Sequence, residues 1–270
     1  MNKITLTILS AFLITASLSA AEASNIFLKG QTQGGTASGA PVTEIAIDSP
    51  GGNRADFELL VCATYSDGSN FFNDATPGWY TQNVVGCGGA PDCIMGIFAR
   101  FDDSTQGVEN QCRWGVGTQV FSGGILRYTG VDSDGAILGE VECNSGDGTT
   151  AVAPSVFAEG GSVVVRIFAA NSFGFVSDVP DFGLGSLGSG VSIGNESMLT
   201  AIYGEPFTED EESGTAEFDL NPGTTWRACS VALNSLDRTV VPTLSEWGVM
   251  VMAGVLGIVG LLVVRRRAAA

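Results

Sequence analysis

Short apolar and alternating segments, separated by turn residues, occupy much of the chain between residues 45 and 233. Residues 57–64 alternate with a period of two and have one strongly apolar face, which is typical of a half-buried strand. Residues 163–168 are mostly β-branched and apolar, as in a central strand that is covered on both faces. Turn residues such as Asp134-Gly135 and Asn221-Pro222-Gly223 separate the segments. The pattern predicts strands at residues 45–47, 57–64, 94–101, 119–128, 137–143, 162–169, 197–203, 214–220 and 226–233.

This series of short strands predicts an all-β body with an antiparallel β-sandwich or jelly-roll-like fold. No long helical period free of glycine precedes Thr243. Two glycine-rich stretches, 30–40 and 180–194, are predicted to be loops or linkers. The second stretch would either cross within one β domain at 24–236, which we favour, or separate off a smaller β unit at 195–236.

An uncharged apolar segment of 18 residues, 247–264, follows the β body. As a helix it would rise about 27 Å, which is close to the thickness of a hydrocarbon core. Thr243 and Glu246 have the spacing of a capping box at its start. We therefore predict a linker at 237–242 and a single transmembrane helix at 247–264, with the β body outside as an ectodomain. The positive-inside rule places the stop-transfer cluster in the cytoplasm, and this cluster is Arg265, Arg266 and Arg267.

The first 23 residues have the features of a secretory signal peptide. Lys3 precedes an apolar or hydroxylated stretch, 4–18, and small residues follow it. We expect signal peptidase to cleave after Ala21 or Ala23, which would leave the β body on the far side of the membrane.

The order of residues that leads into the apolar segment is more specific than anchoring requires. It comprises Pro242, Thr243, Leu244, Ser245, Glu246, Trp247 and Gly248. Together with the apolar helix and the arginines, it resembles the IPTL-CTERM sorting signal of exported Gram-negative bacterial proteins, with Val241 where isoleucine is usual. The resemblance covers residues 241–270. It implies recognition by an exosortase-type membrane transpeptidase and removal or exchange of the tail during export. A simple tail anchor is the alternative.

The segment from Ser24 to Val241 carries 27 of the 29 acidic residues but 8 of the 12 basic ones, a net charge near −19. Such a surface repels nucleic acid and anionic lipid headgroups, so neither is an expected partner. It keeps an exported protein soluble. The chain contains no histidine, which removes the commonest general base, and it has no nucleophile elbow. We predict a non-catalytic protein without a cofactor.

All six cysteines lie in the predicted ectodomain, and an even number in an exported chain suggests disulfides. Cys87 and Cys93 enclose five residues rich in glycine and proline, and they are the pair that we connect from sequence. A metal site is not expected, because histidine and Cys-x-x-Cys pairs are absent. The disulfide candidates are Cys62, Cys87, Cys93, Cys112, Cys143 and Cys229.

Two acidic motifs and one aromatic stretch are candidates for ligand binding. Asp132-Ser133-Asp134-Gly135 is similar to a calcium loop but lacks the twelfth-position glutamate of an EF-hand, so a hairpin turn is the simpler interpretation. The run at 209–212 could attract a cation or form a solvated loop. Aromatic rings beside asparagine and aspartate could stack on sugars, or could cover the end of the sandwich. These rings belong to Phe71, Phe72, Trp79 and Tyr80.

The sequence thus predicts an exported, non-catalytic cell-surface or matrix protein whose tail is processed by an exosortase-like transpeptidase. It would pass through the inner membrane before it reaches the cell surface or the medium. The alternative is a surface domain that binds carbohydrate, or cleaves it with carboxylates, supported by a calcium loop. Surface polysaccharide is the expected ligand class in that case.

Overall fold

A computed structural model describes residues 26–53, 55–64, 72–75, 78–86, 94–102, 109–171, 179–193 and 196–236. All regular secondary structure in these residues is β, and every strand pair is antiparallel. Glu22–Asp237 forms one compact unit. In the described part of the chain, no helix has the length and apolar character needed to cross a membrane. The predicted signal peptide and the predicted transmembrane helix lie outside the described residues.

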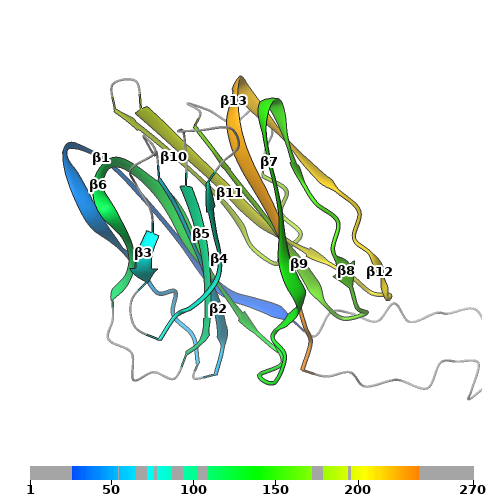
Figure 1. The fold of residues 1–270 in the computed structure, drawn as a ribbon. Helices are drawn as coiled ribbons and strands as arrows, with labels where there is room; N and C mark the ends of the chain where they lie inside the picture. The colour runs from blue at the N-terminus through cyan, green and yellow to red at the C-terminus, as the bar shows by residue number, and fades with distance from the viewer. Residues whose placement is uncertain are drawn as a thin grey trace, which may run out of the picture. The chain divides into compact units, whose positions relative to one another are not determined.

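The strands form two large sheets and one small one (Figure 1). The first sheet has the order β1-β6-β2-β5-β4, with β3 paired to β6 as well. Its strands are β1 (Phe27–Asp48), β2 (Phe57–Thr64), β3 (Phe72–Ala75), β4 (Tyr80–Gly86), β5 (Ile94–Phe101) and β6 (Glu109–Thr129).

The second sheet has the order β10-β11-β9-β13-β7. Its strands are β7 (Ile137–Ala153), β9 (Val163–Ala170), β10 (Ser186–Ile193), β11 (Glu196–Pro206) and β13 (Ala216–Leu233). The small sheet pairs β8 (Phe157–Ala158) with β12 (Glu211–Glu212). The strands after residue 195 therefore alternate with β9 and β7 in one sheet.

The two large sheets pack face to face around the main core. Alternate residues of β2, such as Leu59 and Val61, meet alternate residues of β9, such as Val165 and Ile167, in one buried cluster. This period of two is the pattern that predicted the strands, and burial of the apolar face drives the packing. The expectation of an all-β antiparallel fold is confirmed for the described residues.

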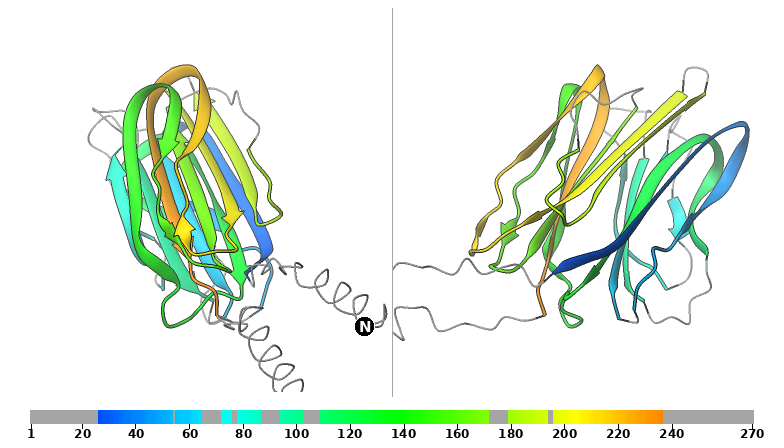
Figure 2. Two further views of the ribbon diagram at one scale, coloured as in Figure 1. Left: turned by 90° about the vertical axis from the view of Figure 1, so that its right-hand side faces the viewer. Right: turned by 180° about the vertical axis from the view of Figure 1, so that it is seen from behind.

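Two long strand pairs bend back over the outer faces of these sheets (Figure 2). In the first sheet, β1 bends so far that its start lies against the residues that follow its end. A Cβ atom on Gly30 would lie only 2.8 Å from the Cβ of Pro50. The β1–β6 pairing has register shifts between Ala37 and Glu44, where the ribbon turns. In the second sheet the β7–β13 ribbon returns in the same way. Ile137, at the start of β7, pairs with Leu233 beside the start of β9. Pro154, which follows the end of β7, nevertheless lies against Arg166 in the middle of β9, so the ribbon must turn back.

The returning ribbons bury the outer faces in two further apolar clusters. Over the first sheet, Trp114 stacks on Phe121 with ring centroids 5.6 Å apart. Over the second sheet, Phe218 from the returning part of β13 stacks on Phe168 of β9 at 5.2 Å. Most strands of the central sheets are therefore apolar on both faces. This explains why residues 57–64 are all buried although their sequence alternates.

A buried arginine holds the returning chain over the first sheet. Arg127 of β6 donates to the carbonyl oxygens of Pro50 and Asn53, both at 2.8 Å. It also pairs with Asp56 at 3.3 Å, with Glu58 at 3.1 Å and with Asp102. Glu58, which is fully buried, bonds to Arg100 at 2.6 Å as well. The cluster pairs buried arginines with buried carboxylates, and it supplies hydrogen-bond donors to carbonyl groups of the segment between β1 and β2.

A second buried arginine, Arg166, holds the returning chain over the second sheet. The Arg166 side chain is fully buried on the outer face of β9. It donates to the carbonyl oxygen of Pro154 at 3.0 Å, and to those of Ser213 and Gly214 at 3.0 and 3.1 Å. Glu205 balances its charge at 3.1 Å. Both returning ribbons are thus fixed to their sheets by guanidinium groups.

The prediction of a loop was wrong for 30–40 and for the second part of 180–194, whereas residues 179–185 form no strand. The stretch 30–40 belongs to β1, where glycines let the returning ribbon approach closely: a Cβ atom on Gly34 would lie 3.4 Å from Ile47. In the stretch 180–194, Ser186–Ile193 is β10, an edge strand paired only with β11. The predicted turn Asn221-Pro222-Gly223 lies inside β13, at a register shift between Asp219 and Thr224.

We predict that Arg127→Met lowers the free energy of unfolding by about 3–5 kcal/mol, because it leaves buried carboxylates without their cation. Arg113→Met is the matched control, since Arg113 pairs with Glu44 at 3.4 Å on the surface and should contribute about 0–1 kcal/mol. Urea unfolding followed by circular dichroism measures both. Equal losses for the two variants would contradict the role of the buried cluster.

Candidate functional site

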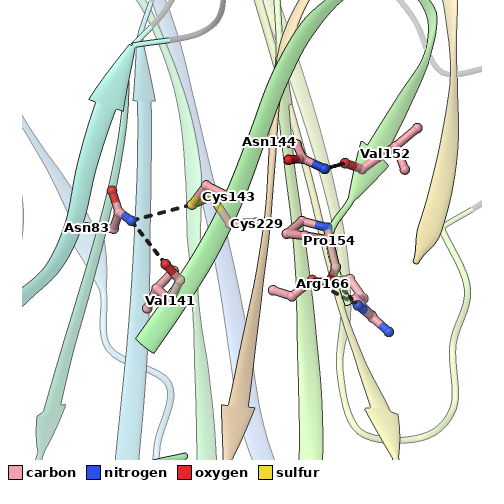
Figure 3. Close-up of a disulfide and its surroundings, with 9 residues drawn as sticks. Asn83, Val141, Cys143, Asn144, Val152, Pro154, Arg166 and Cys229 are labelled. Atoms are coloured by element: carbon pink, nitrogen blue, oxygen red, sulfur yellow. Dashed lines mark hydrogen bonds between the residues drawn. A yellow bond between two sulfur atoms is a disulfide. The ribbon is translucent and has the colours of Figure 1, made fainter. Parts of the chain in front are cut away.

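The described residues contain two disulfides, and each fixes a long strand. Cys143 of β7 and Cys229 of β13 are directly opposite in register, with Cα atoms 4.1 Å apart (Figure 3). Cys62 of β2 bonds to Cys112 in the returning part of β6, with Cα atoms 6.0 Å apart. The bridges close segments of 86 and 50 residues. Chain entropy predicts a stabilisation of about 4 kcal/mol for each, lowered by any strain.

These bonds confirm four of the six predicted disulfide cysteines. Cys229 ties the C-terminal strand β13 to the earlier strand β7 through its bond to Cys143. Cys87 and Cys93 lie outside the described residues, so their predicted pairing stays a prediction.

The Cys143–Cys229 bond lies at the edge of the second sheet, beside an edge strand of the first. Asn83 of β4 donates its side-chain amide to the carbonyl oxygen of Val141 at 3.4 Å and to the sulfur of Cys143 at 3.5 Å. On the other side of the sandwich, the Gln31 side chain exchanges two hydrogen bonds of 3.1 Å with the backbone of Ser186. A side-chain amide thus joins the two sheets at each open edge.

The aromatic candidates divide between the core and the surface. Trp79 is 7% exposed and packs in the outer cluster of the first sheet, where Arg100 lies 4.3 Å from its ring centre. This cation–π contact and the burial show that Trp79 covers the sheet and does not offer a stacking face. Tyr80 is 71% exposed. Phe71 and the side chain of Phe72 lie outside the described residues.

One acidic motif connects the two large sheets, and the other leads into strand β12. The Asp132 carboxylate accepts a hydrogen bond from the amide of Asp134 at 2.9 Å, which closes the turn, and one from Asn234 at 3.4 Å. In the run at 209–212, Asp210 accepts from the amide of Gly160 at 2.8 Å. Among the described residues, no three side chains of the metal-binding types gather closely enough to hold an ion. Asp132-Ser133-Asp134-Gly135 is thus a turn that links β6 of the first sheet to β7 of the second, not the predicted hairpin, and in the other run Glu211 and Glu212 form strand β12.

A groove of about 390 Å³ lies between the first half of β7 and the returning ribbon. Its walls combine carboxylates with an exposed phenylalanine ring, and they include Glu140, Glu142, Glu159, Glu212 and Phe157. Sequence analysis missed this groove. Glu140 and Glu142 lie on β7, Glu159 follows β8 and Glu212 lies on β12, and they meet only because β7 and its continuation fold back over the sheet.

Three titratable groups have pKa values displaced mainly by burial. Burial raises the pKa of the Tyr128 hydroxyl in the main core, so the phenol is neutral. Burial also raises the pKa of Tyr203, with Arg166 opposing this shift and Glu205 adding to it. Burial lowers the pKa of Arg227. Shifts of this kind are expected for packed side chains. Among the described residues they point to no pair of groups in which one donates a proton and the other accepts it.

The family comparison identifies the tail. Residues 239–268 match the IPTL-CTERM motif. The match contains all seven residues of the predicted sorting motif, Pro242 to Gly248, and the arginine cluster, all of which lie outside the described residues. No curated protein and no solved structure matches the chain.

We predict that Trp79→Ala lowers the free energy of unfolding by about 3–5 kcal/mol, because it removes a buried ring and leaves a cavity. The neighbouring change, Tyr80→Ala, removes an exposed ring and should cost less than about 0.5 kcal/mol. Thermal and urea unfolding of the two variants test this. A larger loss for Tyr80→Ala than for Trp79→Ala would contradict the assignment of Trp79 to the core.

Proposed function

We propose that this chain is an exported, non-catalytic surface or matrix protein that an exosortase-type membrane transpeptidase processes at its C-terminal tail. The IPTL-CTERM match at residues 239–268 carries this proposal, because it is a sorting signal of exported proteins. In the proposed sequence of events, signal peptidase removes residues 1–23 and the helix at 247–264 holds the protein in the inner membrane. Processing of the tail then releases or transfers the β body to the cell surface or the medium.

The chemistry of the β body supports export. Both described disulfides bury at least one of their cysteines completely, and such bonds form and persist in oxidising compartments. β13, which carries Cys229, is placed between β9 and β7 in its sheet and ends only ten residues before Thr243. The body therefore completes its second sheet only when the chain next to the sorting signal has crossed the membrane.

The side chains of the body support a structural role over catalysis. The buried carboxylates Asp56 and Glu58 are engaged by arginines that hold the bent ribbon, and so is the partly exposed Asp102. The chain has no histidine to activate a nucleophile. A protein with two sheets fixed at both outer faces is suited to act as a stable spacer or polymer-contacting module.

We predict that the mature protein has the mass of a chain without residues 1–23 and with a shortened or exchanged tail. Its cysteines 62, 112, 143 and 229 should not react with iodoacetamide unless a reductant is added. Intact-mass spectrometry of each cell fraction measures both properties. A full-length cytosolic protein with free thiols would overturn the proposal.

We predict that Trp247→Ala, or replacement of Arg265, Arg266 and Arg267 by glutamine, impairs processing. Both changes remove features by which the signal is recognised or oriented in the membrane. The unprocessed form should accumulate in the membrane fraction, whereas Tyr80→Ala, a surface change in the body, should be processed as the unaltered protein is. Unchanged mature mass and location in both tail variants would show that this signal is not used.

A further inference from the structure

The two described disulfides differ in how far a reagent can reach them. Cys62 and Cys112 are both fully buried between the first sheet and the returning β1–β6 ribbon. Cys229 is also fully buried, on the main-core side of β13. Cys143 is partly exposed, because β7 is the edge strand of its sheet and pairs only with β13. Of the four bonded cysteines that the structure describes, Cys143 is therefore the accessible one.

The side chain of Asn83 contacts the Cys143 sulfur. The amide of Asn83 approaches the Cys143 sulfur from β4, across the gap between the edges of the two sheets (Figure 3). Its second hydrogen bond, to the carbonyl oxygen of Val141, holds the amide in this place. Both hydrogen bonds are long, at 3.5 and 3.4 Å, and Asn83 is itself partly exposed. The polar side chain of Asn83 is thus weakly held against the sulfur, and a small displacement would move it away.

We propose that Cys143–Cys229 is a thiol–disulfide exchange site, attacked at Cys143 by a dithiol of the kind that exported oxidoreductases carry, and that Asn83 controls access to it. A thiolate of the dithiol forms a bond to the Cys143 sulfur while the bond to Cys229 breaks, and Cys229 leaves as a thiolate that takes up a proton. The second thiol of the dithiol then attacks its own partner in the mixed disulfide and releases Cys143 as a thiol. Two electrons pass from the dithiol to the cystine.

The exchange acts on the edge that closes the main core. Ile137, Val141 and Cys143 pack against the core from β7, and each is only partly buried. The hydrogen bonds to β13 remain after reduction, but the pairing has a register shift between Ser230 and Ala232, opposite this part of β7. The cystine therefore holds a partly exposed edge strand of the second sheet, and its reduction loosens this strand. The opposite face of the same segment lines the acidic groove, through Leu138, Glu140 and Glu142.

The test compares the rates at which the two disulfides are reduced in the folded protein. The full-length protein in detergent is incubated with dithiothreitol in native buffer, quenched with iodoacetamide at intervals and analysed by peptide mass spectrometry. We expect Cys143 and Cys229 to be alkylated at least about tenfold faster than Cys62 and Cys112, because exchange requires access to a sulfur. Circular dichroism should show that the β structure persists during the first reduction.

Two variants separate access from general weakening of the edge. Asn83→Ala removes the contact with the sulfur and should speed reduction of Cys143–Cys229 several-fold, with no change for Cys62–Cys112. Asn144→Ala is the matched control: Asn144 neighbours Cys143 on β7, but its amide bonds to the carbonyl oxygen of Val152 at 3.2 Å. It should leave the rate unchanged.

Three results would overturn the proposal. These are reduction of both disulfides together with loss of the β structure, reduction of Cys62–Cys112 first, or equal rates in Asn83→Ala and the unaltered protein. The first two are measured on the unaltered protein, so they do not depend on how the variants fold. None of the three concerns tail processing, so the exchange site and the sorting function succeed or fail separately.

Discussion

The fold depends on the contacts between two buried guanidinium groups and the carbonyl oxygens of chain segments that return over the sheets. A strand pair that bends away from its neighbours loses ladder partners, and unpaired buried carbonyl groups are costly. Arg127 donates hydrogen bonds to such carbonyl groups for the β1–β6 ribbon, and Arg166 does so for the β7–β13 ribbon. Each arginine is in turn neutralised by carboxylates, Glu58 in the first sheet and Glu205 in the second. Without these contacts the outer faces of both sheets would be exposed apolar surfaces.

The parts of this fold that follow from local pattern could be predicted from the sequence. Phe57–Thr64 and Ile94–Phe101 are strands with the predicted bounds, because short alternating or apolar segments are a local signal that needs no knowledge of the fold. The glycine-rich stretch in β1 could not be predicted as a strand, since its glycines serve a contact with Pro50 and Ile47 that forms only in the folded chain. The same holds for β13, where a segment that resembles a turn continues the strand through a register shift. Tertiary pairing overrides local propensity at these positions.

The candidate sites also divide into those set by local sequence and those set by tertiary pairing. The sorting motif is contiguous in sequence, so seven neighbouring residues were enough to identify it, and the family match agrees. The Cys143–Cys229 bond, its contact with Asn83 and the groove with Glu140, Glu159 and Glu212 combine residues from distant strands. Their proximity is set by strand order and by the direction in which the ribbons bend. Neither is encoded in any local pattern, and with six cysteines 15 pairings are open before the fold is known.

The buried arginines also change the electrostatics of the exterior. Of the eight basic residues between Ser24 and Val241, Arg100, Arg127 and Arg166 are buried against carboxylates or carbonyl oxygens, and Arg227 is partly buried. The described part of the second sheet's returning ribbon, 144–160 and 208–225, contains acids and no lysine or arginine. Fewer basic side chains therefore lie on the surface than composition alone indicates, and repulsion between the remaining acids acts between copies as well as against polyanions. The burial of arginines that stabilises the interior thus also lowers the number of positive charges on the surface.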